Sequence, residues 1–262
     1  VLGDDARIQS TAGTLNLSGG ITGTDHTVTF GGAGDISVTA AIATAAGGLT
    51  KDGAGTLHLA VAAGNTFSGA TLISAGSVVT EAANQFNNAS LLTIDFGASL
   101  ALNDFSQTIG SLAGTGTLDF GAGGLAELTL SGGSASFGGS FSGAGTIIIG
   151  PGATLTLGAD FNAPNINFTL AGGTLALNGT TSTFGLLHIT GASVLDFGNS
   201  TASVLTVNDL TFQSTGLQLA VSNWANVSDY FYAQNFTGAT PDTRGNTPQN
   251  QVAFAGFSTA NT

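Results

Sequence analysis

Residues 48–76 read GLTKDGAGTLHLAVAAGNTFSGATLISAG, and this stretch decides the fold. Polar and apolar residues alternate over 56–59, so Leu57 and Leu59 leave the same face of a strand. Glycines flank this strand, and a second short strand is predicted at 70–74. Two short strands with glycine-rich corners form one coil, which buries its apolar side chains only when other coils stack on it.

Apolar pairs of the same kind recur along the chain and set its period. The first positions of successive pairs are about 20 residues apart, or about twice that number, which is the size of one β-solenoid coil. Stacked coils pair their strands in parallel, about 4.8 Å apart, and enclose a continuous core. The sequence therefore predicts an all-β fold, a single parallel β-solenoid of about a dozen coils. The pairs are Leu15/Leu17, Leu57/Leu59, Leu100/Leu102, Leu118/Phe120, Leu155/Leu157, Leu175/Leu177, Leu195/Phe197 and Leu217/Leu219.

The same alternation predicts which side chains lie inside the stack. In the three Asp-Phe-Gly triplets, which begin at Asp95, Asp119 and Asp196, the phenylalanine is expected inside and the aspartate in solvent. Lys51, the single lysine, is expected to be a surface charge. The phenylalanines expected to stack as interior ladders are Phe67, Phe96, Phe105, Phe120, Phe137, Phe141 and Phe161.

The pattern changes near residue 222, and this change predicts two regions. The only tryptophan and both tyrosines of the chain lie beyond this point, and residues 238–250 are polar with two prolines, as in a loop. Solenoids need atypical terminal coils, because an open end exposes core and unpaired backbone groups. We therefore expect a solenoid over residues 1–221 and a C-terminal capping or docking segment over 222–262.

Composition and charge exclude several classes of protein. The net charge is −12, from 15 acidic residues against three basic ones, which argues against nucleic-acid binding and against docking on anionic lipid. There is no cysteine, which excludes disulfides and thiolate metal sites, and no apolar run long enough for a transmembrane segment. The chain begins at Val1 without a signal-peptide pattern, which indicates a mature or trimmed product.

The opening stretch resembles a known family. The pattern GLxKxGxGTLxL from Gly48, followed by NxFxGxTxIxAG from Asn65, closely resembles the autotransporter-associated β-strand repeat of bacterial surface and secreted proteins. The family usually has tyrosine at the position of Phe67. The resemblance implies a right-handed parallel β-helix, export from a Gram-negative cell, and a place at the cell surface or outside the cell. It implies no reaction, because the repeat is a scaffold.

Among three functional hypotheses, the one that involves a reaction is a polysaccharide-degrading β-helix enzyme. Glycoside hydrolysis needs two carboxyl groups about 5 to 10 Å apart, and Asp95 and Asp119 come nearest to a suitable spacing. No third acid extends this pair, and the chain has only three basic residues. We therefore predict no catalytic residue and no enzyme activity.

No metal or cofactor site is predicted either. His26, His58 and His188 are scattered over distant coils without the paired spacing of a zinc site. Residues 31–35 resemble the calcium-binding nonapeptide, but the motif occurs once, and it binds calcium through repetition.

The leading functional hypothesis is a secreted structural protein, a β-solenoid subunit that assembles head to tail into an extracellular fibre or matrix. The alternative is a surface adhesin or autotransporter passenger that binds host or neighbouring cells through loop 237–250. The expected partner is a second copy of the chain, with a cell surface or a glycan as alternatives. The candidate interface residues are Val1, Leu2, Ile8, Trp224, Tyr230, Phe231, Tyr232, Phe254 and Phe257.

Overall fold

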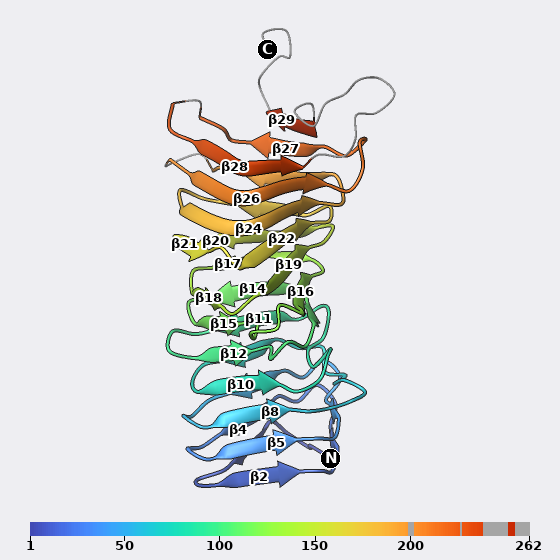
Figure 1. Cartoon of the computed structure of the whole chain (residues 1–262). Helices are drawn as coiled ribbons and strands as arrows, with labels where there is room; N and C mark the ends of the chain where they lie inside the picture. Colours follow the sequence, from blue (N-terminus) through green and yellow to red (C-terminus); the bar gives the residue numbers. More distant parts are fainter. Residues whose placement is uncertain (199–201, 226, 238–250, 255–262) are drawn as a thin grey trace.

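The computed structural model describes residues 1–198, 202–225, 227–237 and 251–254. Over these residues the chain is a stack of short β-strands without an α-helix, and every strand pair is parallel. Figure 1 shows the coils stacked along one axis, with the N-terminus at one end and β29 near the other. The predicted all-β parallel solenoid is therefore confirmed.

One sheet, called here the first sheet, runs through the whole stack with twelve strands among the described residues. Ala6 pairs with Val28, Val28 with Leu49 and Leu49 with Thr71, which gives a coil of about 21 residues. This repeat length agrees with the period predicted from the apolar pairs. Its strands are β1 (Ala6–Gln9), β4 (Val28–Gly31), β7 (Leu49–Lys51), β9 (Thr71–Ile73), β11 (Leu91–Ile94), β14 (Ser111–Gly114), β17 (Gly133–Phe137), β20 (Ala153–Leu157), β23 (Thr174–Ala176), β25 (Ser193–Asp196), β27 (Leu219–Ser222) and β29 (Val252–Phe254).

The second sheet faces the first one in the N-terminal half of the stack. It ends at β18, so the cross-section of the solenoid changes along its axis. Its strands are β2 (Thr14–Leu17), β5 (Asp35–Val38), β8 (Thr56–Leu59), β10 (Ser77–Thr80), β12 (Ser99–Ala101), β15 (Thr117–Asp119) and β18 (Ser140–Ser142).

The third sheet begins in the middle of the chain and forms the remaining side of the C-terminal half. A short pair, β3 (Ile21–Thr22) with β6 (Ile42–Ala43), forms a separate sheet in the first coils. The strands of the third sheet are β13 (Gln107–Ile109), β16 (Ala126–Leu130), β19 (Gly145–Ile149), β22 (Ile166–Leu170), β24 (Thr181–Ile189), β26 (Val204–Phe212) and β28 (Tyr230–Thr237), and β21 (Phe161–Ala163) pairs with β24 beside them.

Strand β24 covers two sides of the coil, because it pairs with β21 through its first half and with β22 through its second half. Gly185 lies where the two halves meet. A Cβ atom there would lie 2.5 Å from Oδ1 of Asn167 and 2.7 Å from the carbonyl oxygen of Pro164. Only glycine leaves room for this close approach of neighbouring coils.

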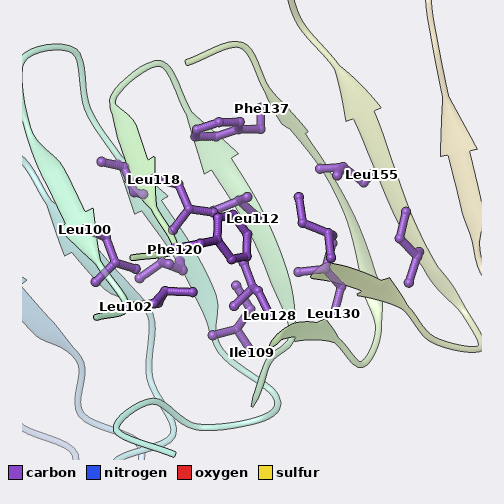
Figure 2. Packing of buried hydrophobic residues seen from close by; sticks show 14 of the residues in the cluster. Leu100, Leu102, Ile109, Leu112, Leu118, Phe120, Leu128, Leu130, Phe137 and Leu155 are labelled. Atoms are coloured by element: carbon purple, nitrogen blue, oxygen red, sulfur yellow. The ribbon is translucent and has the colours of Figure 1, made fainter. Parts of the chain in front are cut away.

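Alternate side chains of each strand fill the space between the sheets. Leu57, Val78 and Leu100 are stacked in register in the second sheet, and all three are fully buried. Figure 2 shows the same arrangement further along, where Leu118 and Phe120 point toward Leu112 and Leu128 from the opposite side. The core is therefore continuous along the axis, and no coil has one of its own.

Side-chain amides replace strand pairing in the middle coils, between the end of β6 and the start of β13. Asn65 accepts a hydrogen bond from the backbone N–H of Ile42 and donates one to the carbonyl of Gln85. The amide of Gln85 bonds both backbone groups of Val61, and Gln107 accepts from the N–H of Gln85. These contacts link successive coils where the backbone forms no ladder.

The predicted phenylalanine ladders form in part. Phe141 stacks on Phe137 and Phe161 with ring centroids 5.0 and 4.7 Å apart, and Phe67 and Phe120 are fully buried.

Two members of the predicted set were wrong. Phe96 is 87% exposed and Phe105 is 37% exposed. After β11 the chain turns at Asp95, whose carbonyl accepts from the N–H of Ala98, and Ala98 takes the inward position. The turn interrupts the alternation on which the prediction for Phe96 was based.

The predicted boundary near residue 222 falls at the end of β27, which spans Leu219–Ser222. The described part of the following segment adds β28 to the third sheet and β29 to the first. The division into a solenoid and a capping segment stays a prediction. The predicted loop 238–250 lies outside the described residues.

Candidate assembly surfaces

The N-terminal end of the stack presents a first coil with an incompletely covered core. Ile8, Leu15 and Leu17 point inward but are only partly buried, whereas Phe30 and Val38 in the next coil are fully buried. In the described structure β1, β2 and β3 each have a neighbouring strand on one side only. This end therefore offers both apolar side chains and unpaired backbone groups.

Val1 and Leu2, the other predicted contacts at this end, differ in environment. Val1 is fully exposed. Leu2 donates its backbone N–H to the carbonyl of Thr22 at 2.6 Å, and its side chain packs against the core. Of this pair, Val1 is the residue free to contact a partner.

At the other end, the predicted anchors Trp224 and Phe254 pack within the chain. The Trp224 ring lies edge-on to Phe197 and to Phe254, with centroids 4.8 and 5.0 Å apart. Both residues are only partly buried, so part of this cluster is open to solvent. Phe257 lies outside the described residues.

The predicted residues of β28 alternate between the core and the surface. Phe231 packs against the core, whereas Tyr230 and Tyr232 are 45% and 52% exposed. The two tyrosine rings are nearly parallel, with centroids 5.9 Å apart. Phe236, further along β28, is 39% exposed, so the aromatic surface of this strand is formed by the two tyrosines and Phe236.

Asp229 is a buried structural residue that the sequence reasoning missed. Its carboxylate accepts the backbone N–H groups of Ser203 and Ala225, which ties the turn before β28 to the preceding coil. The sequence alone does not point to Asp229, because one of its partners, Ala225, lies in the turn and the other, Ser203, lies in the neighbouring coil.

Lys51 was predicted to be a surface charge, and this prediction was wrong. Its side chain is only 2% exposed, in an inward position between Phe30 of β4 and Ile73 of β9. The ammonium group donates to the carbonyl oxygens of Asp52, Gly53 and Ala75 at 2.7 to 3.1 Å.

This position shifts the pKa of Lys51 downward. Burial lowers the pKa below the ordinary value of 10.5, and the carboxylates of Asp52 and Asp35 act in the opposite direction. Through its three hydrogen bonds, Lys51 joins the corner of its own coil, at Asp52 and Gly53, to the corner of the next coil, at Ala75.

Replacing Lys51 by methionine tests this role. We expect Lys51→Met to lower the free energy of unfolding at neutral pH by about 2 kcal/mol, because three carbonyls lose a charged donor. Between the lowered pKa and 10.5 the unfolded state binds more protons than the folded state, so wild-type stability rises with pH there. Denaturant unfolding across that range should show the rise in wild type and not in Lys51→Met.

The control for this variant is Ile73→Met, at the equivalent inward position of the next coil. It should cost less than about 1.5 kcal/mol and should keep the pH-dependent rise. Equal stability of wild type and Lys51→Met at every pH would contradict the role given to the ammonium group.

The two aspartates considered for glycoside hydrolysis lie on different sheets. Asp95 follows β11 of the first sheet, whereas Asp119 ends β15 of the second. Oδ1 of Asp119 accepts the N–H of Gly121, and Asp196 accepts from Gly198 in the same way. For Asp119 and Asp196, the structure supports a local role at a strand end.

Each histidine lies near a polar side chain of a neighbouring coil, and for His26 this is Asp5, with Nδ1 3.9 Å from Oδ1. Nδ1 of His58 is 2.7 Å from Oε1 of Glu81, and Nδ1 of His188 is 2.7 Å from Oγ1 of Thr211. In the part of the chain that the structure describes, no three acidic or histidine side chains gather as metal ligands would. The same part contains no helix with the length and apolar character of a membrane span.

A comparison with models of known protein families gave a match over the stretch that predicts the fold. Residues 49–79 match the family model of the passenger-associated-transport-repeat. Over these residues the chain is similar to a passenger repeat, as its resemblance to the autotransporter-associated repeat predicted. The match runs from β7 into β10 and includes Lys51. Together with the solenoid fold, it makes the chain similar to the β-helix of an autotransporter passenger. Comparisons with the curated proteins and with the solved structures each gave no significant match.

Proposed function

We propose that the chain is a secreted structural protein, a β-solenoid subunit that associates head to tail into an extracellular fibre or matrix. The observation that carries this proposal is the half-buried first coil. Ile8, Leu15 and Leu17 continue the inward columns of the core but lack full cover. A further coil stacked on β1 and β2 would bury them and continue the parallel ladder, as in β-strand addition.

The difference between the two ends supports a directional assembly. One end presents aliphatic side chains from β1 and β2, and the other presents Tyr230 and Tyr232 of β28. Contact between two different surfaces is heterologous, and it propagates as a filament unless it closes into a ring. The passenger repeat supports a location at the surface of a Gram-negative cell or outside it.

We also propose that the protein has no enzymatic activity. The separation of Asp95 and Asp119 onto different sheets favours this proposal. A surface-held passenger that contacts host or neighbouring cells is the second candidate, and the passenger repeat favours it. Beads coated with purified protein would adhere to cells if this second function were the correct one, whether or not fibres form.

A charge placed in the first coil tests head-to-tail association. We expect Leu17→Asp to abolish fibres seen by negative-stain electron microscopy, because stacking would bury the new carboxylate. Leu17 also packs partly against the core of the single subunit, so circular dichroism is used to show that the variant remains folded, and loss of fibres in the folded variant supports the proposal.

Asn16→Asp is the matched control, because Asn16 is the adjacent outward residue of the same strand. It should leave fibres intact. Wild-type protein that stays monomeric at high concentration, or Leu17→Asp that still forms fibres, would contradict the proposal.

A further inference from the structure

The outer face of the first sheet carries no charged side chain over eight consecutive strands, from β4 to β23. Every outward residue there is a threonine, serine, alanine or leucine. The only lysine of these strands, Lys51, points inward. The outward residues are Thr29, Thr50, Leu72, Leu91, Thr93, Ser111, Ala113, Ser134, Ser136, Thr154, Thr156, Thr174 and Ala176.

Apart from Asp196 in β25 of the first sheet, the acidic side chains of the strands lie in the other two sheets. Asp35 and Asp119 lie in the second sheet, and Glu127 and Asp209 lie in the third. Asp52, at the corner after β7, has its side chain 33% exposed and pairs with Arg7. The chain carries a net charge of −12, so two copies repel each other in most orientations. Among the strands of this face Asp196 alone carries a carboxylate, and Asp52 and Asp95 lie at its edge, directly after β7 and β11. Two copies can therefore approach on this face with few carboxylates near each other.

The two ends of this face carry opposite charges in one column. Arg7 of β1 is in register with Thr29, and at the far end Ala176 of β23 is in register with Asp196 of β25. Arg7 already pairs with Asp52 at 2.5 Å, but 46% of its side chain is exposed and a guanidinium has five donors. The Arg7 guanidinium can therefore also donate hydrogen bonds to a second carboxylate.

From this distribution we propose that two copies of the chain pair side by side and antiparallel through the outer face of the first sheet. A two-fold axis between β11 and β14 brings Arg7 of each copy to Asp196 of the other. Near the axis, Thr93 of one copy faces Ala113 of the other. This lateral contact is isologous and closes at a dimer, so it differs from head-to-tail association.

The size of the face is sufficient for a specific contact. The ten strands from β1 to β25, at about 4.8 Å each, give a length of about 48 Å, and three to five residues per strand give a width of about 10 to 16 Å. Two such surfaces bury about 1,000 to 1,500 Å² in total, which reaches the lower part of the range for stable interfaces. Apart from Leu72 and Leu91 the outward side chains are small, which lets two such faces meet closely.

A carboxylate at the centre of the face tests the pairing. In the Leu17→Asp background, which removes fibres, we expect Thr93→Asp to weaken dimerisation at least tenfold in sedimentation equilibrium, because two new carboxylates lie near the two-fold axis in each dimer. Thr129→Asp makes the same change at an outward threonine of β16 in the third sheet, and it should dimerise as wild type does. Equal loss in both variants, or a wild type without dimers, would overturn the proposal.

Charge reversal tests the antiparallel arrangement. Arg7→Glu and Asp196→Lys should each weaken the dimer, and the double variant should recover most of the affinity. Lack of recovery, with all three variants still folded, would exclude the Arg7 to Asp196 contact. Leu17→Asp distinguishes the two modes of assembly, because it should remove fibres and leave the lateral dimer unchanged.

Discussion

Val78→Asp is expected to lower the free energy of unfolding by at least about 4 kcal/mol, which is enough to prevent stable folding of the middle coils. Val78 is fully buried in β10, between Leu57 and Leu100 of the neighbouring coils. The substitution places a carboxylate in a continuous apolar column where the described structure provides no basic partner. It also removes a buried aliphatic side chain, and both changes favour unfolding.

Val79→Asp is the matched control, because it makes the same chemical change one residue further along the same strand. Val79 points outward and is only partly buried. We expect a loss of less than about 1 kcal/mol. Thermal unfolding followed by circular dichroism measures both variants. Similar melting temperatures for the two would contradict the direction in which these side chains point.

The second large effect is expected for Gln85→Leu, with a loss of about 3 kcal/mol. Gln85 is fully buried, and its side-chain amide accepts from the N–H of Val61 and donates to the carbonyls of Val61 and Ala83. Leucine is of similar size but leaves these three buried backbone groups without a partner, each at a cost of about 1 to 3 kcal/mol.

Gln218→Leu is the control for this second variant. Gln218 is exposed, so the same substitution should change the stability by about 0.5 kcal/mol or less. Denaturant unfolding gives both values. Hydrogen exchange at Val61 adds a local readout, because its amide should lose protection in Gln85→Leu. Retained protection there, together with wild-type stability, would show that water replaces the side chain.

The candidate assembly residues lie in different environments, for a physical reason. Exposure at Val1, Tyr230 and Tyr232 agrees with a contact role, which still awaits a test. Trp224 and Phe254 were chosen because aromatic residues dominate buried contacts, and the structure packs them against each other and Phe197. Aromatic content predicts burial, but it does not say whether the buried contact lies within the chain or between chains.

The sequence by itself determined the period, the strands and the inward columns. Alternation over two residues and recurrence over about 21 residues are local properties, and every coil repeats them. Leu57, Leu59 and Leu100 therefore lie in the core as predicted. The passenger repeat was likewise visible in the residues alone.

The tertiary structure decided what happens at the corners and between the sheets. The ammonium group of Lys51 turns to carbonyls of two coils, Phe96 leaves the core at a turn, and Gln85 replaces a missing ladder. The uncharged outer face of the first sheet also appears only when eight separate strands come into register. These features depend on neighbours one coil away, about 21 residues along the chain, and alternation within a strand carries no information about them.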